Sequence, residues 1–108
     1  MIKYWDYLRE YKKLKHEILN SVNKVFESGT LLFGQELKKF EKNFCKFNNS
    51  KYGLGVGSGT DALFIALKVL DIGIGDEVIT VSNTAIPTVA AIKNTGAEVR
   101  FVDIGKDF

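Results

Sequence analysis

Apolar residues recur every three or four positions from Asp6 to Ser28, with lysine and glutamate in many of the places between them. They are Leu8, Tyr11, Leu14, Ile18, Val22 and Val25. Because an α-helix turns once in about 3.6 residues, this spacing puts the apolar side chains on one face and predicts an amphipathic helix over residues 6–28. Gly29 follows at the place where a helix commonly ends.

A second helix with the same spacing follows an apolar connector. The connector is "TLLFG", residues 30–34, and the helical pattern after it carries Leu37, Phe40, Phe44 and Phe47. The stretch "NNSKYG", residues 48–53, ends this helix, since asparagine, serine and glycine favour turns. Residues 1–50 are therefore expected to form an amino-terminal helical segment.

After residue 50 the pattern changes to short apolar runs that alternate with helical ones. We expect strands at residues 52–56, 76–82 and 97–104, and helices at residues 60–70 and 84–96. Strand, helix, strand, helix, strand is typical of a parallel sheet, so the predicted fold class is α/β, with amino-terminal helices followed by a βαβαβ unit of a mainly parallel sheet. Such a sheet leaves an edge and apolar surface uncovered, so residues 51–108 are expected to be the start of an incomplete α/β domain.

Composition and charge exclude several classes of protein. The 108 residues are 45% hydrophobic and 26% charged with a formal net charge of +2, which is typical of a globular domain and leaves no basic stripe for nucleic acid. No run reaches the roughly eighteen apolar residues of a membrane helix, and the charged start of the chain favours the cytoplasm, so we expect neither a nucleic-acid nor a membrane partner. The single cysteine, Cys45, is predicted to be a buried thiol, and no metal site is expected.

The stretch "GVGSGTDAL", residues 55–63, is the strongest candidate for binding a ligand. Gly57-Ser58-Gly59 forms a turn in which the backbone can come close to a ligand. Thr60 and Asp61 then open a helix whose unpaired N–H groups and dipole favour an anion such as a phosphate. The alternative is that Ser58 or Thr60 only caps the helix and the glycines only turn the chain.

Two known phosphate motifs fit this stretch poorly. A P-loop requires a lysine after its last glycine, and no lysine lies between Gly55 and Leu67. A dinucleotide-binding fingerprint requires a third glycine where Thr60 stands, and a carboxylate after the second strand where Ser82 and Asn83 stand. The P-loop is thereby excluded, and the dinucleotide motif is weak.

A family resemblance extends over nearly the whole chain. The segments "VGSGTDALFIAL", "GIGDEVIT", "SNTAIPTVAAI" and "GAEVRFVDI" resemble the amino-terminal part of the DegT/StrS sugar aminotransferases. The earlier "SGTLLFGQELKKFEKNF", which includes Gly34 and Glu41, is similar to the lead-in of that family. The pair "SGTDAL" and "GDEVI" is far more specific than a glycine run alone. The resemblance implies part of a fold-type I large domain and pyridoxal 5′-phosphate as the cofactor.

The resemblance also implies roles for particular residues. Family members bind the cofactor phosphate at the start of this helix, which here is Gly59, Thr60 and Asp61. They usually place an aromatic ring over the pyridoxal at the position of Ala85, so Ala85 is expected to be a ring neighbour that lacks the stacking contact. In the family the lysine that forms the Schiff base lies further along the polypeptide, so the catalytic residues are unknown here. The lysines of this chain are interpreted as solvated surface, among them Lys38, Lys39, Lys42 and Lys68.

We therefore interpret the chain as the amino-terminal fragment of a pyridoxal-phosphate-dependent aminotransferase. The full-length enzyme would transfer an amino group from an amino acid, expected to be glutamate, to a nucleotide-linked keto sugar, and the fragment alone is predicted to be inactive. A homodimer is expected, with the connector residues Leu31, Leu32 and Phe33 either in its interface or packed within one subunit. Three alternatives stay open: a noncatalytic phosphate-binding or interaction module of this family, a nucleotide-binding α/β domain, and a relative with dehydratase chemistry.

Overall fold

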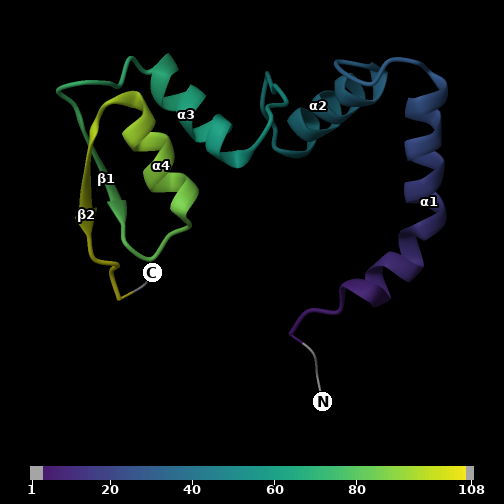
Figure 1. The fold of residues 1–108 in the computed structure, drawn as a ribbon, viewed down its shortest axis with the longest axis horizontal. Helices are drawn as coiled ribbons and strands as arrows, with labels where there is room; N and C mark the ends of the chain where they lie inside the picture. The colour runs from purple at the N-terminus through teal and green to yellow at the C-terminus, as the bar shows by residue number, and fades with distance from the viewer. Residues whose placement is uncertain (1–3, 107–108) are drawn as a thin grey trace. The chain divides into compact units, whose positions relative to one another are not determined.

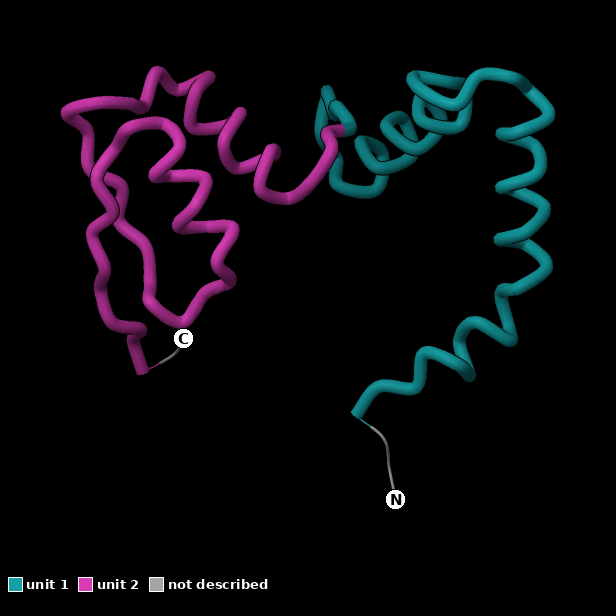
Figure 2. Tube along the Cα trace, in the orientation of Figure 1, with its two compact units in different colours: residues 1–55 teal, residues 56–108 magenta. Residues whose placement is uncertain are grey.

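The structure is a computed structural model that describes residues 4–106. The chain divides into two compact units, residues 1–55 and residues 56–108, which are coloured teal and magenta in Figure 2. None of the helices among residues 4–106 combines the length and the apolar character needed to cross a bilayer.

Unit 1 begins with helix α1, Tyr7–Glu27, and the predicted helix over residues 6–28 is confirmed (Figure 1). Asp6 is its N-cap, because the Asp6 carboxylate accepts a hydrogen bond of 3.3 Å from the backbone N–H of Arg9. The helix ends at Ser28, and Gly29 turns the chain with a φ of +66°. Glycine adopts a positive φ without the strain that a side chain adds, so it favours this turn.

Helix α2, Gln35–Phe47, confirms the second predicted helix. Neither α1 nor α2 contains a buried residue. The connector before α2 is also exposed, with 60% to 80% of the surface of Leu31, Leu32 and Phe33 accessible. Unit 1 therefore shows amphipathic helices whose apolar side chains remain largely at the surface.

The predicted strand at residues 52–56 is wrong, because these residues lie in no strand. A strand exists only where its backbone groups pair with a neighbouring strand. Among the described residues the backbone N–H of Gly55 instead donates a 2.8 Å hydrogen bond to Oε1 of Glu41 in α2. The apolar alternation of this segment thus leads to packing on a helix and not to a third strand.

Unit 2 contains the elements α3 (Gly59–Val69), β1 (Glu77–Val81), α4 (Ile86–Thr95) and β2 (Glu98–Val102). The two strands pair in parallel, with Val78 opposite Val99 and Thr80 opposite Phe101. Pro87 lies in the first turn of α4, as expected, because the missing N–H of proline would have no partner at that point. The predicted α/β class with a parallel sheet is confirmed, with two strands among residues 4–106.

The core of unit 2 forms around the end of α4. Ala91, Ile92, Thr95 and Ala97 are buried there. The hydroxyl of buried Thr95 donates to the carbonyl of Ile92 at 2.7 Å and accepts from the N–H of Ala97 at 3.3 Å, so this polar group is fully satisfied. Helices α3 and α4 pack side by side with their axes in a similar direction (Figure 1).

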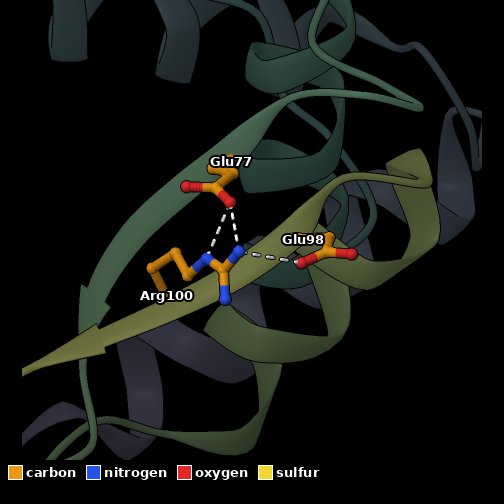
Figure 3. Close-up of polar contacts among 3 residues, drawn as sticks. All are labelled: Glu77, Glu98 and Arg100. Carbon is orange, nitrogen blue, oxygen red and sulfur yellow. Dashed lines mark hydrogen bonds and ion pairs between the residues drawn. The ribbon is translucent and has the colours of Figure 1, made fainter.

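Three charged residues link the two strands on the sheet surface (Figure 3). The Arg100 guanidinium contacts Glu77 through Nε, at 2.8 Å, and through Nη2, and it lies 3.4 Å from Glu98. The hydrogen bond from Arg100 lowers the pKa of Glu77, and the Glu77 carboxylate raises the pKa of Arg100. All three side chains are more than half exposed, so the cluster adds little to stability.

Candidate functional site

Gly59, Thr60 and Asp61 occupy the first turn of α3, and Ser58 is the N-cap. The backbone N–H of Asp61 donates to Oγ of Ser58 at 3.1 Å, and the Ser58 hydroxyl donates to the Asp61 carboxylate at 2.9 Å. This pair is a variant of the capping box, in which Asp61 accepts from the hydroxyl of Ser58 and not from its backbone N–H. It satisfies one of the helix's first amides and stabilises the start of the helix. Ser58 therefore caps the helix, and the amides that this cap leaves unpaired are the ones to consider for a ligand.

The amides of Gly59 and Thr60 are the ones that remain for a ligand. Within residues 4–106, neither N–H donates to another protein group. The first amides of a helix point outward along its axis, and the helix dipole adds partial positive charge there. Thr60 is half-buried and brings a hydroxyl to the same turn. Two outward N–H groups and a hydroxyl form a set of donors that matches a phosphate.

The glycines of this stretch differ in what the protein itself requires of them. A Cβ added to Gly57 would lie 2.8 Å from Oδ2 of Asp61, so the capping box accounts for that glycine. A Cβ added to Gly59 would meet no atom within 4 Å, and the φ of Gly59 is not in the left-handed region. Packing and backbone strain therefore give no reason for a glycine at position 59, whereas the close approach of a ligand to the backbone would.

Asp61 has two opposing properties at this turn. Its carboxylate adds negative charge in the first turn of α3, which stabilises the helix but disfavours a second anion nearby. Its N–H is held by Ser58, so an anion bound by that amide would have to replace the serine hydroxyl. Among the described residues, the amides of Gly59 and Thr60 are therefore free to bind an anion, whereas the amide of Asp61 is occupied by Ser58.

Ala85 is the N-cap of α4, immediately beyond the segment that follows β1. Its exposed methyl group caps nothing, while its carbonyl accepts the N–H of Thr88 at 3.0 Å. The hydroxyls of Thr84 and Thr88 share a 2.9 Å hydrogen bond beside it. Ala85 thus lies at the carboxyl end of a parallel strand, where ligands of open α/β sheets commonly bind.

The residues interpreted as surface lie where expected. Lys38, Lys39, Lys42 and Lys68 are all exposed. Asp103 accepts the N–H of Ile104 at 2.8 Å and so shapes the turn after β2. Cys45 was predicted to be buried but is half-buried, with its sulfur next to the position that a Cβ on Gly53 would take.

Two contacts were absent from the sequence interpretation. The Ser58–Asp61 box has a sequence signal, since serine followed three residues later by an acidic residue is a known helix-start pattern. The bond from Gly55 to Glu41 joins residues fourteen positions apart and has no local signal. It depends on how α2 and the following segment fold together.

Comparison with known proteins places these observations in context. The model of the DegT/DnrJ/EryC1/StrS aminotransferase family matches residues 12–108. A dTDP-3-amino-3,4,6-trideoxy-alpha-D-glucose transaminase of Micromonospora megalomicea is 45% identical over 100 residues, which cover 93% of this chain and 27% of that protein. The chain spans about a quarter of the length of the curated relatives it matches first.

Solved structures give the same picture. DesV of S. venezuelae, in complex with a ketimine intermediate, superposes with a TM-score of 0.91 at 38% identity, over 98% of this chain and 29% of that one. NtdA of Bacillus subtilis, with bound cofactor PMP, has a TM-score of 0.82 at 33% identity, over 86% of this chain and 21% of that one. The matches extend over both the helical and the α/β parts of the chain.

Proposed function

This chain belongs to the DegT/DnrJ/EryC1/StrS aminotransferase family, and on that premise we propose that it is the amino-terminal part of a pyridoxal-phosphate-dependent sugar aminotransferase. The full-length enzyme transfers an amino group from glutamate to the keto group of a nucleotide-linked sugar. The name of the Micromonospora relative, a transaminase of a dTDP-linked amino sugar, supports this substrate class. The PMP bound to the NtdA neighbour supports the cofactor.

The observation that carries the proposal is the pair of outward amides at Gly59 and Thr60, beside a glycine that its own packing does not require. In our proposal these N–H groups and the Thr60 hydroxyl hold the cofactor phosphate. Asp61 joins them through its amide when Ser58 releases it. The donor set fits a phosphate, because the first turn of a helix binds anions with its backbone amides.

The proposed position of the phosphate also assigns roles to Ala85 and to the rest of the cofactor. Ala85 lies beside the cofactor ring and leaves room where an aromatic side chain would stack. When bound, pyridoxal phosphate supplies the electron-withdrawing ring on which an amino group is carried between donor and acceptor. The lysine that holds the cofactor covalently belongs to a part of the enzyme outside this sequence, so residues 1–108 bind and orient but are inactive alone.

Assembly and location remain part of the proposal. A homodimer would cover the exposed connector Leu31–Leu32–Phe33, although packing within one subunit would do the same. The cytoplasm remains the proposed location.

A cofactor titration of the full-length protein tests the proposal. Added pyridoxal phosphate should give a visible absorption band that disappears on borohydride treatment, and glutamate with a nucleotide-linked keto sugar should then yield 2-oxoglutarate. A noncatalytic module would bind the cofactor phosphate without turnover, and a nucleotide-binding domain would give no band. A folded full-length protein that shows no band contradicts the proposal.

The Gly59→Ala variant locates the phosphate. The new methyl group meets no protein atom within 4 Å, and alanine favours a helix over glycine, so stability should be unchanged or slightly higher. Cofactor affinity should fall about tenfold or more, because the methyl group enters the space of the bound phosphate. Thr60→Ser, which keeps the hydroxyl, is the matched control and should bind nearly as well as the wild type.

A further inference from the structure

One face of α2 contacts the segment that leads into the candidate site. Leu37, Glu41 and Cys45 are the half-buried residues of α2, and all other residues of this helix are exposed. They are spaced four residues apart, so they follow one another along a single face. The side chains of this face lie against the glycines of residues 53–55.

The contact is close enough that a side chain at Gly53 or Gly55 would force side chains of α2 to move. A Cβ on Gly53 would lie 2.7 Å from Sγ of Cys45, and a Cβ on Gly55 would lie 2.7 Å from Cδ1 of Leu37 and 3.5 Å from Oε1 of Glu41. Both glycines therefore present a bare backbone to the helix. Gly53 and Gly55 are thereby explained by α2, unlike Gly59.

Glu41 makes the one polar contact across this face. Its Oε1 accepts the 2.8 Å hydrogen bond from the N–H of Gly55, and the pair is partly buried. The other side-chain hydrogen bonds among the described residues of unit 1 join positions no more than five apart. A charged acceptor in a partly buried bond is stronger than a neutral one, so Glu41 holds the backbone at Gly55 in one conformation.

We propose that Glu41 is a positioning residue for the cofactor phosphate. It orders the backbone at Gly55, three residues before the capping residue Ser58 along the chain, and so restricts the conformations of the segment that leads into the turn. A segment that is ordered before binding loses less conformational freedom when the phosphate arrives. This inference rests on the proposed function and adds to it a role for a side chain that does not touch the cofactor.

The test compares Glu41→Ala, Glu41→Gln and Glu36→Ala in the full-length protein. Glu36 lies on the same helix but is exposed and pairs with Lys39, so Glu36→Ala controls for the loss of a carboxylate from α2. The two measurements are hydrogen exchange of the Gly55 amide without cofactor, and the dissociation constant of pyridoxal phosphate. Glutamine keeps an acceptor oxygen, so Glu41→Gln should retain most of the amide protection and cofactor affinity that Glu41→Ala loses.

The proposal predicts faster exchange at Gly55 in Glu41→Ala and about tenfold weaker cofactor binding, with Glu41→Gln and Glu36→Ala close to the wild type. Equal exchange in Glu41→Ala and the wild type overturns it, and so does faster exchange with unchanged affinity. If the wild type itself binds no cofactor, the proposed function fails. If the wild type binds the cofactor and only Glu41→Ala binds it weakly, the proposed function stands and the role of Glu41 is supported.

A second pair of variants covers the case in which Glu41→Ala does not fold. Gly55→Ala places a methyl group 2.7 Å from Cδ1 of Leu37 and should weaken cofactor binding. The same substitution in a Leu37→Ala background has room for that methyl group and should regain part of the affinity. Equal affinity in Gly55→Ala and the wild type contradicts a positioning role for this contact.

Discussion

The two units of this chain bury the apolar residues of their helices to different degrees. In unit 1, Ile18 on α1 is 43% exposed and Phe26 is 65% exposed, and neither helix buries a residue. In unit 2, Ile92 on α4 is 3% exposed and lies in a small core with Ala91 and Ala97. The difference shows that periodicity specifies a helix, whereas burial depends on which neighbours pack against it.

The glycines of residues 53–59 differ in what a Cβ at each position would contact. Gly53 and Gly55 of unit 1 permit the chain to lie closely on α2, and Gly57 of unit 2 makes room for the cap of α3. A Cβ at Gly59, in contrast, would contact no atom of the described residues. Gly59 is therefore the glycine of the candidate site that packing within the protein does not explain.

The largest expected difference between the units comes from Ile92→Ala. Removing a buried isoleucine side chain should lower the free energy of unfolding by about 3 kcal/mol, because apolar contacts are lost and a cavity remains. Ile18→Ala in α1 should cost less than about 1 kcal/mol, since that side chain is already partly in water. Urea denaturation measures both, and equal losses would contradict the contrast in burial.

Two glycines that follow helices give the next largest effect. Gly96 after α4 has a φ of +92°, and Gly29 after α1 has a φ of +66°. Alanine at either position should cost about 1 kcal/mol from backbone strain. At Gly96 the Cβ would also lie 2.7 Å from Cγ1 of Ile74, so Gly96→Ala should cost about 2 kcal/mol in total. A smaller loss in melting temperature for Gly96→Ala than for Gly29→Ala would reverse this prediction.

Removing the N-caps of α3 and α1 should lower the stability by smaller amounts. Ser58→Ala should cost about 1 kcal/mol, because it removes both bonds of the capping box. Asp6→Ala should cost about 0.5 kcal/mol, because the longer bond from Arg9 is the one side-chain cap lost at α1. Thermal unfolding of the two variants measures the difference, and Ser58→Gly should recover most of the loss at α3.

The smallest expected effect is the pH dependence of stability that two exposed ion pairs contribute. Hydrogen bonds from Arg100 and from Lys39 lower the pKa values of Glu77 and Glu36 below the ordinary 4.5. Because each pKa is lower in the folded state, each pair stabilises the fold above pH 4.5, and this contribution is lost as the pH falls through the folded pKa. Arg100→Met should raise the titration midpoint of Glu77 in carbon-13 NMR spectra while that of Glu36 stays unchanged. A Glu77 midpoint that does not move would show that the pair across the strands is not formed.

The sequence predicted the elements that local rules determine. The helix over residues 6–28 has a continuous apolar stripe and an acidic cap, and the structure has α1 at Tyr7–Glu27. The strands at Glu77–Val81 and Glu98–Val102 are short runs rich in β-branched residues between turn signals. In each case neighbouring residues carry enough information to fix the backbone.

What the sequence could not predict depends on contacts between distant residues. Residues 52–56 alternate like a strand, but Glu41 takes the N–H of Gly55, and no periodicity indicates that partner. The Ser58–Asp61 box could have been predicted from its spacing. The special position of Gly59 could not, because it follows from the empty space around a missing Cβ and not from the residue type.

A crystal structure of the full-length protein grown with pyridoxal 5′-phosphate would locate the phosphate. We expect phosphate oxygens about 2.9 Å from the backbone nitrogens of Gly59 and Thr60, at the start of α3. A phosphate bound elsewhere, with the Gly59 and Thr60 amides left to water, would contradict this expectation.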